Sequence, residues 1–131
     1  MEATLELYRR ELLKGSTETL LLSVLADESM YGYQLVKEMD SRSSGYFRFK
    51  EGTLYPALRR LERDGLLEGR WRASPTGQDR RYYHVTAKGR ARLLSMLEEW
   101  NLFTKAVNLV AQSNGVARLR ARRFSEVPRL P

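Results

Sequence analysis

The apolar residues in the first half of the chain recur with the 3.6-residue period of α-helices. This pattern predicts an amphipathic helix over residues 2–14, built on Leu5, Tyr8, Leu12 and Leu13 and ended by Gly15. Further helices are predicted from Ser16-Thr17 to about residue 26, over residues 31–42, and from about residue 51 to Gly65. Their expected inward positions are Leu20, Leu21, Val24 and Leu25; Leu35, Val36 and Met39; and Leu54, Leu58 and Leu61. Ser16-Thr17 and Thr53 are expected to cap two of these helices.

The period changes after Gly65, where two runs favouring strands flank a polar loop that contains Pro75 and Gly77. Residues 66–72 and 80–86 are therefore expected to form a β-hairpin. Thr86-Ala87-Lys88-Gly89 then opens a long helix that extends to about residue 112. The predicted fold is mainly α with a small β-hairpin. It is a winged helix-turn-helix with an added N-terminal helix and a long C-terminal dimerisation helix.

A heptad pattern runs along the long helix and indicates a partner helix. Its seam consists of Leu93, Met96, Trp100, Phe103, Val107 and Val110. A second stripe, formed by Leu94, Leu97, Ala106 and Leu109, is available to pack on the N-terminal helix. Packing of both stripes within one chain is the alternative interpretation. We expect residues 1–86 to form a winged-helix domain, 87–113 the dimerisation helix and 114–131 a disordered basic tail.

Composition excludes several classes of function. The chain has 131 residues, no cysteine and one histidine, so disulfides, thiolate metal sites and most His- or Cys-based catalysis are absent. No nucleophile–base pair or glycine-rich phosphate loop is present, and we expect no enzymatic activity, metal or cofactor. No run approaches the ~20 apolar residues that span a bilayer. The start of the chain lacks secretory features, which predicts a cytoplasmic protein without membrane contact.

Positive charge is concentrated in the middle of the sequence. The net charge is +7, and residues 48–92 carry 12 basic and 5 acidic residues. Such a local excess attracts polyanions, whereas a solvated surface is the alternative interpretation. The helix from Thr53 to Asp64 would present Thr53, Pro56, Ala57, Arg60, Arg63 and Asp64 outward, with Tyr55, Arg59 and Glu62 at the margins. This layout suits a helix that enters the major groove of DNA.

The hairpin adds a second basic element. Its edges carry Arg70, Arg72, Arg80 and Arg81, which can reach the sugar-phosphate backbone. Tyr83 and Val85 are expected to face inward, and His84 is expected to face solvent. Trp71 is interpreted as a packing residue, with base stacking as the alternative.

Three segments resemble the signature blocks of PadR-type transcriptional regulators. They are Gly32-Tyr33-Gln34-Leu35, Gly52-Thr53-Leu54-Tyr55-Pro56-Ala57-Leu58-Arg59-Arg60-Leu61-Glu62-Arg63-Asp64-Gly65-Leu66 and Arg80-Arg81-Tyr82-Tyr83-His84-Val85-Thr86-Ala87-Lys88-Gly89. The resemblance spans residues 12–110 in the order and spacing of the family. The short C-terminal part is similar to small members of the family with one dimerising helix.

The resemblance implies a homodimeric, effector-responsive repressor whose two recognition helices read a palindromic operator in double-stranded DNA. Carried across by position, it brings Tyr31 or Tyr33, Thr53, Tyr55, Pro56 and Arg59 near the DNA, and Arg80 and Arg81 to the wing. Two alternatives remain open. One is a winged-helix module whose basic face binds an acidic protein, and the other is a regulator of another winged-helix family.

The resemblance also bears on Trp100. In small multidrug-sensing PadR proteins, similar tryptophans sandwich flat aromatic ligands across the dimer interface. Trp100 and Phe103 are therefore candidate ligand-binding residues for a small aromatic effector. The alternative is that Trp100 fills the interface without a ligand.

Overall fold

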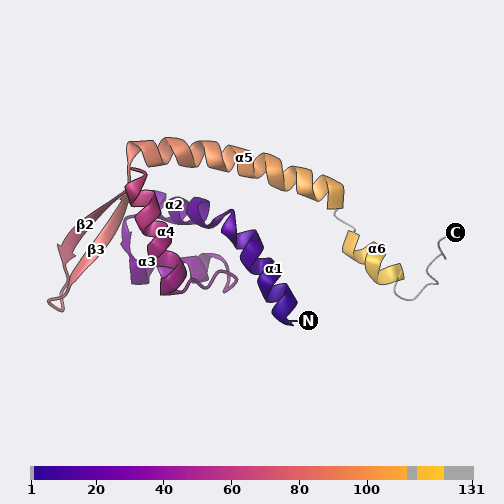
Figure 1. Ribbon diagram of the computed structural model, residues 1–131, viewed down its shortest axis with the longest axis horizontal. Coiled ribbons are helices and arrows are strands. Elements are labelled where there is room, and N and C mark those ends of the chain that lie inside the picture. The colour runs from indigo at the N-terminus through magenta and orange to yellow at the C-terminus, as the bar shows by residue number, and fades with distance from the viewer. Residues whose placement is uncertain (1, 112–114, 123–131) are drawn as a thin grey trace. The chain divides into compact units, whose positions relative to one another are not determined.

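The computed structural model describes residues 2–111 and 115–122 and divides the chain into two compact units, residues 1–96 and 97–131 (Figure 1). The first unit holds helices α1 (Glu2–Lys14), α2 (Thr17–Asp27), α3 (Gly32–Arg42) and α4 (Glu51–Arg63), and strands β1 (Met30–Tyr31), β2 (Leu67–Ala73) and β3 (Asp79–Val85). Helix α5 (Ala87–Ala111) begins in the first unit and continues into the second, which also contains α6 (Gly115–Arg122). The mainly helical winged-helix fold predicted from the sequence is confirmed.

The core of the first unit is built from the leucines that the helical period identified. Leu21, Leu35, Leu54, Leu58 and Leu61 have no exposed surface, and α2, α3 and α4 contact one another around them. Leu20 and Val36 are only partly buried, while Leu22 is fully buried. Burying several leucine side chains at about 1.5–3 kcal/mol each is the main force that holds α4 against the rest of the unit.

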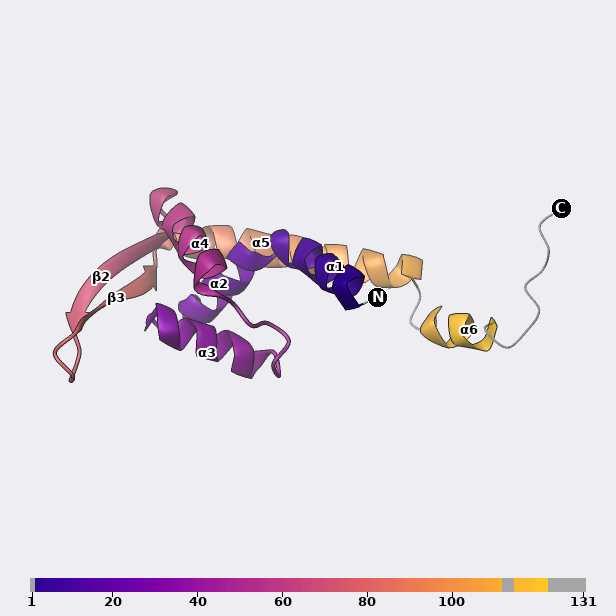
Figure 2. The ribbon, with the colours of Figure 1, turned by 60° about the horizontal axis from the view of Figure 1, so that its bottom comes forward.

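The sheet has three strands in the order β1-β3-β2, all antiparallel. The hairpin of β2 and β3 projects from the helices (Figures 1 and 2). The third strand, β1, pairs Met30 with Tyr83 and Tyr31 with Tyr82. A strand of two residues is too short to produce a periodic signal, so the sequence pattern did not reveal it.

Ser16 is the N-cap residue of α2, as predicted, but its side chain makes no capping hydrogen bond. The hydroxyls of Ser16 and Thr17 instead donate to the Leu13 carbonyl at the end of α1, at 3.2 and 2.9 Å. The predicted cap at Thr53 is wrong. Thr53 is the third residue of α4, whose N-cap is Lys50. The predicted end of α4 is correct, because Gly65 adopts a φ of +77° and the Leu66 amide bonds the Leu61 carbonyl at 2.9 Å.

The basic tail is helical where the structure describes it. Residues 115–122 form α6, whereas a disordered segment was expected from the charge of this region. Alanine, leucine and arginine are all strong helix formers, which accounts for the helix. Residue 114 and residues 123–131 of the expected tail lie outside the described part of the chain.

Candidate DNA-binding surface

Helix α4 presents a polar face opposite its leucines. Thr53, Arg59, Arg60 and Arg63 are exposed, Tyr55 retains 36% of its surface, and Pro56 is partly buried. Ala57 was expected on this face but is fully buried. It lies three residues after Leu54 and one before Leu58, so it belongs to the stripe that contacts the core. The polar face is therefore narrower than the sequence pattern indicated.

The arginines of this face differ in what already neutralises them. Arg60 lies 3.6 Å from a Glu18 carboxylate oxygen of α2, and Arg63 lies 3.3 Å from its neighbour Asp64. Both pairs are exposed, and such pairs contribute only about 0–1 kcal/mol, so a phosphate can replace either carboxylate. Within the described residues, Arg59 has no ion pair or hydrogen bond. Arg59 is thus the cation of α4 that is most available to DNA.

Tyr55 connects this face to the start of α3. A Cβ atom built on Gly32 would collide with the Tyr55 hydroxyl and lie 2.9 Å from the ring carbon that carries it. The absence of a side chain at Gly32 therefore lets α3 and α4 approach closely through Tyr55. This contact gives a physical reason for glycine at position 32, the first residue of the sequence block at residues 32–35.

A track of alternating rings and cations runs from α3 across the sheet to the wing, which is the hairpin of β2 and β3, residues 67–85. The Tyr31 ring stacks with Tyr33 at 6.5 Å and meets Tyr82 edge-on at 5.4 Å. Arg80 lies 4.5 Å above Tyr31, Arg72 lies 4.4 Å above Tyr82, and Lys37 lies 4.7 Å above Tyr33. Tyr31, Tyr33 and Arg80 were predicted site residues, and the structure brings them together. The contacts of Arg72 and Tyr82 depend on strand pairing, whereas Lys37 follows Tyr33 by one turn of α3. The sequence interpretation named none of these three contacts.

Arg81 and Trp71 lie on the opposite face of the hairpin. Trp71 was interpreted as a packing residue, but it is 65% exposed. Arg81, a predicted DNA contact, donates a hydrogen bond to the Glu62 carboxylate of α4 and lies 5.6 Å above the Trp71 ring. Between this face of β3 and α4 is an open cleft of about 900 Å³, lined by Tyr55, Pro56, Arg59, Arg60, Glu62, Arg63, Arg81 and Tyr83. The cleft brings most predicted α4 residues beside the wing.

His84 was expected to face solvent and is instead partly buried. Its Nδ1 shares a hydrogen bond with the Ser29 hydroxyl, and its Nε2 is buried without a partner among the described residues. Burial, followed by the positive charges of Arg70 and Arg72, lowers the pKa of His84. A neutral ring near pH 7 therefore joins the base of the wing to the loop before β1, and the residue has a structural role.

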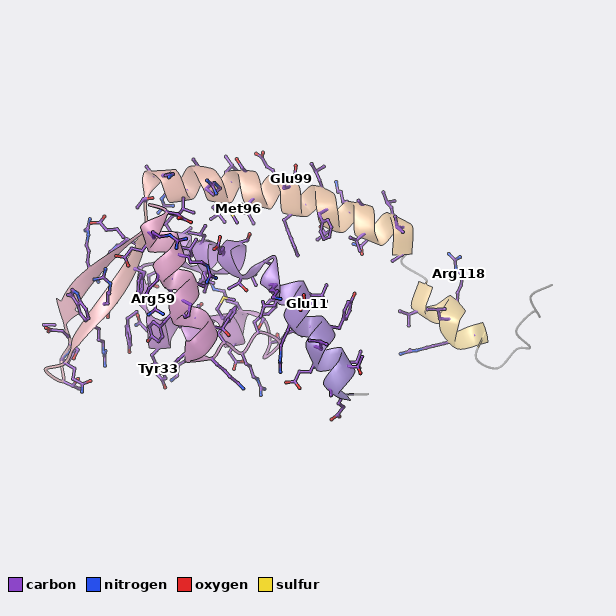
Figure 3. The ribbon with its side chains drawn as sticks, viewed as in Figure 1. Glu11, Tyr33, Arg59, Met96, Glu99 and Arg118 are labelled. Atoms are coloured by element: carbon purple, nitrogen blue, oxygen red, sulfur yellow. The ribbon has the colours of Figure 1, made fainter. Side chains whose placement is uncertain are left out.

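The predicted seam of α5 separates into two parts. Leu93 is 7% exposed and belongs to the core of its own chain, and Met96 packs against that core. Trp100, Phe103, Val107 and Val110 retain 43, 59, 45 and 86% of their surfaces. The ring centroids of Trp100 and Phe103 lie 6.0 Å apart. Figure 3 labels Met96 on the same helix, one turn before Trp100. The unpartnered seam is therefore shorter than the heptad pattern suggested.

Figure 3 also labels Arg59 on α4 and Tyr33 on α3, which both lie on the side of the first unit from which the wing extends.

Across residues 2–111 and 115–122, no helix combines the length and the apolar character that crossing a membrane requires. The same residues contain no group of three potential metal ligands close enough to hold an ion.

The comparisons with known proteins agree with this geometry. The model of the transcriptional regulator PadR-like family matches residues 21–95. The transcriptional regulator Rv3488 of Mycobacterium tuberculosis is 38% identical over 84 residues, which cover 64% of this chain and 75% of that protein. A solved PadR family regulator from Eggerthella lenta is 31% identical with a TM-score of 0.74, covering 86% of this chain and 96% of its own. A PadR-like regulator from Bacillus cereus is 33% identical with a TM-score of 0.69, and the match covers 79% of this chain and 98% of that protein.

Proposed function

This chain belongs to the PadR-like family of DNA-binding transcriptional regulators, and from this premise we propose that it is a homodimeric repressor of a palindromic operator. The observation that carries the proposal is the pairing of an unneutralised Arg59 on α4 with the cationic ring track of the wing. One element has the shape of a major-groove reader, and the other spreads positive charge beside it. Family membership removes the alternative of a regulator from another winged-helix family.

The proposed contacts with each half-site come from three elements. The exposed face of α4, with Thr53, Tyr55, Pro56, Arg59, Arg60 and Arg63, would enter the major groove. The hydroxyls of Tyr31 and Tyr33 and the guanidinium of Arg80 would bond phosphate oxygens, because these groups recur as backbone contacts. Residues 1–86 would form this DNA-binding part.

The proposed dimer forms through residues 87–113 of each chain. Trp100, Phe103, Val107 and Val110 leave apolar surface exposed, and α1 leaves Leu5, Tyr8 and Leu12 exposed at 49, 60 and 54%. Apolar stripes of this kind on two helices are stabilised when a second copy covers them. Leu93 and Met96, which already contact their own core, would lie at the edge of this interface.

We expect selection from a random DNA pool at two salt concentrations to enrich a palindrome. Its half-site centres should lie about one helical turn, or a multiple of it, apart. Light scattering on the same sample should give the mass of a dimer. Enrichment that survives the higher salt supports operator recognition, since contacts made only to phosphates weaken steeply as salt rises. Binding without enrichment would overturn the proposal and favour a basic surface for another partner.

The proposed effector is a small flat aromatic compound held by Trp100 and Phe103. These rings form an exposed pair, and in a two-fold dimer a second pair would face them. We expect such compounds to quench the Trp100 emission of a Trp71→Phe chain and to change its affinity for the selected operator. Quenching without a change in DNA affinity would leave a ligand site but no effector.

A further inference from the structure

We propose that the ion pair between Glu62 and Arg81 fixes the wing relative to α4, so that the two elements contact DNA in one register. Arg81 is then a positioning residue rather than a DNA contact. The proposal rests on the proposed function, because it concerns how the two DNA-binding elements act together.

The geometry of the pair distinguishes it from the other ion pairs of the described residues. Arg81 Nη2 donates to Glu62 Oε2, which joins β3 to α4 across 19 positions of sequence. The two side chains are 31 and 32% exposed, less than those of any other ion pair in the described parts of the chain. Partial exclusion from water strengthens the attraction and reduces screening by salt.

Gly69 makes this position of Arg81 possible. The register pairs Gly69 with Tyr83 and Trp71 with Arg81, so these four residues share one face of the hairpin. A Cβ atom on Gly69 would lie 2.5 Å from the Arg81 guanidinium carbon, a separation that no side chain tolerates. The guanidinium therefore lies over Gly69, with the Trp71 ring 5.6 Å away, on its route to Glu62.

Beyond Tyr82 and Tyr83, which pair with β1, the wing consists of two strands only, and a two-stranded hairpin is marginally stable by itself. Leu67 and Tyr83 anchor its base, with 2 and 6% of their surfaces exposed. Arg81 lies two residues before Tyr83 on β3, nearer the tip of the hairpin, and links this part of the hairpin to α4. A fixed angle between helix and wing lowers the entropy cost when both bind one DNA segment.

The proposal makes an unusual prediction about charge. Removing an acidic residue from a DNA-binding face reduces repulsion of phosphates, and it would also release Arg81 if Arg81 were a DNA contact. Loss of the Glu62 charge should then strengthen binding. If the ion pair positions the wing, the same change should weaken it. The two roles of Arg81 therefore predict effects of opposite sign.

The experiment compares Glu62→Gln with Glu51→Gln, using the operator selected by the wild-type chain. Glu51 is an exposed acid on the same helix and has no ion pair within the described residues, so both variants lose one negative charge. We expect Glu62→Gln to bind about 10-fold more weakly, with loss of DNA protection at the wing. Glu51→Gln should bind as tightly as wild type or more tightly. Arg81→Gln should match Glu62→Gln, and the double variant should be no weaker than either.

Two further measurements separate positioning from loss of folding. Thermal unfolding identifies a variant that is simply unstable, and the exchanged chain Glu62→Arg/Arg81→Glu should recover operator binding. Without DNA, the emission of Trp71, taken as the difference from a matched Trp71→Phe chain, should shift in Glu62→Gln because Arg81 leaves the ring. Unchanged emission, or binding of Glu62→Gln as tight as that of Glu51→Gln, overturns the positioning role. Failure of the wild-type chain to select an operator instead overturns the proposed function.

Discussion

A chain that carries Gly89→Ala is expected to be less stable by about 1–3 kcal/mol, although alanine is the better helix former. A Cβ atom at this position would collide with the carbonyl oxygen of Leu66 and lie 2.8 Å from a Val85 methyl carbon. That carbonyl cannot move freely, because it accepts the Thr86 amide at 3.1 Å. Overpacking costs about 1–3 kcal/mol and the strained hydrogen bond about 1 more, against a propensity gain near 1.

The matched control is Gly52→Ala, which also lies in the first turn of a helix. A Cβ atom on Gly52 meets nothing within 4 Å, so this variant should be as stable as wild type or slightly more stable. Urea unfolding of the three proteins at one protein concentration measures the difference, since dimerisation would make stability depend on concentration. Equal midpoints for both variants would contradict the close contact between α5 and the hairpin.

The start of α5 shows which features of the fold can be predicted from a sequence pattern and which cannot. Thr86 caps α5, because its hydroxyl accepts the Gly89 amide at 3.0 Å and donates to the Gly65 carbonyl at 2.6 Å. The local part of this arrangement, a threonine before a helix, was predictable from the residue type alone. The approach of Gly89 to Leu66 was not, because it depends on how the hairpin returns to the helix.

The same division explains the errors at the candidate site. The leucine period correctly predicted α4, since burial of Leu54, Leu58 and Leu61 requires no knowledge of distant residues. Ala57 was misplaced because alanine is compatible with either face of a helix. Trp71 and His84 were misplaced because the hydrophobicity of a strand residue does not reveal which element covers it. Their surroundings depend on the pairing of β3 with both of its neighbours.

The roles of the arginines depend even more on tertiary structure. In the sequence, Arg59, Arg60 and Arg81 are equivalent basic residues in one charged region. In the structure, Arg60 pairs with Glu18 and Arg81 pairs with Glu62. Arg59 has no acidic partner within residues 2–111 and 115–122. Charge composition therefore predicted the ligand class, while the geometry separates candidate contacts from residues already engaged.

Arg59→Ala is accordingly expected to cause the largest loss of operator affinity among the α4 variants. A guanidinium bound to a guanine edge contributes about 1–3 kcal/mol per half-site, and two half-sites roughly double the loss. Arg60→Ala should cost less, because release of Glu18 offsets part of the lost attraction. Binding to the selected operator should be measured over a range of salt concentrations. Arg59→Ala and Arg60→Ala should both unfold at the wild-type temperature, since both arginine side chains are exposed.

Arg92→Ala is the matched control, because Arg92 is exposed on α5 and has no ion pair within the described residues. Removing it changes the net charge by the same amount without altering α4. If Arg59 contacts a base, its loss should relax selection at one operator position and leave the salt dependence unchanged. If it contacts a phosphate, the slope of log affinity against log salt should fall by about 0.9 per half-site. Equal binding by Arg59→Ala and Arg92→Ala would exclude both kinds of contact for Arg59.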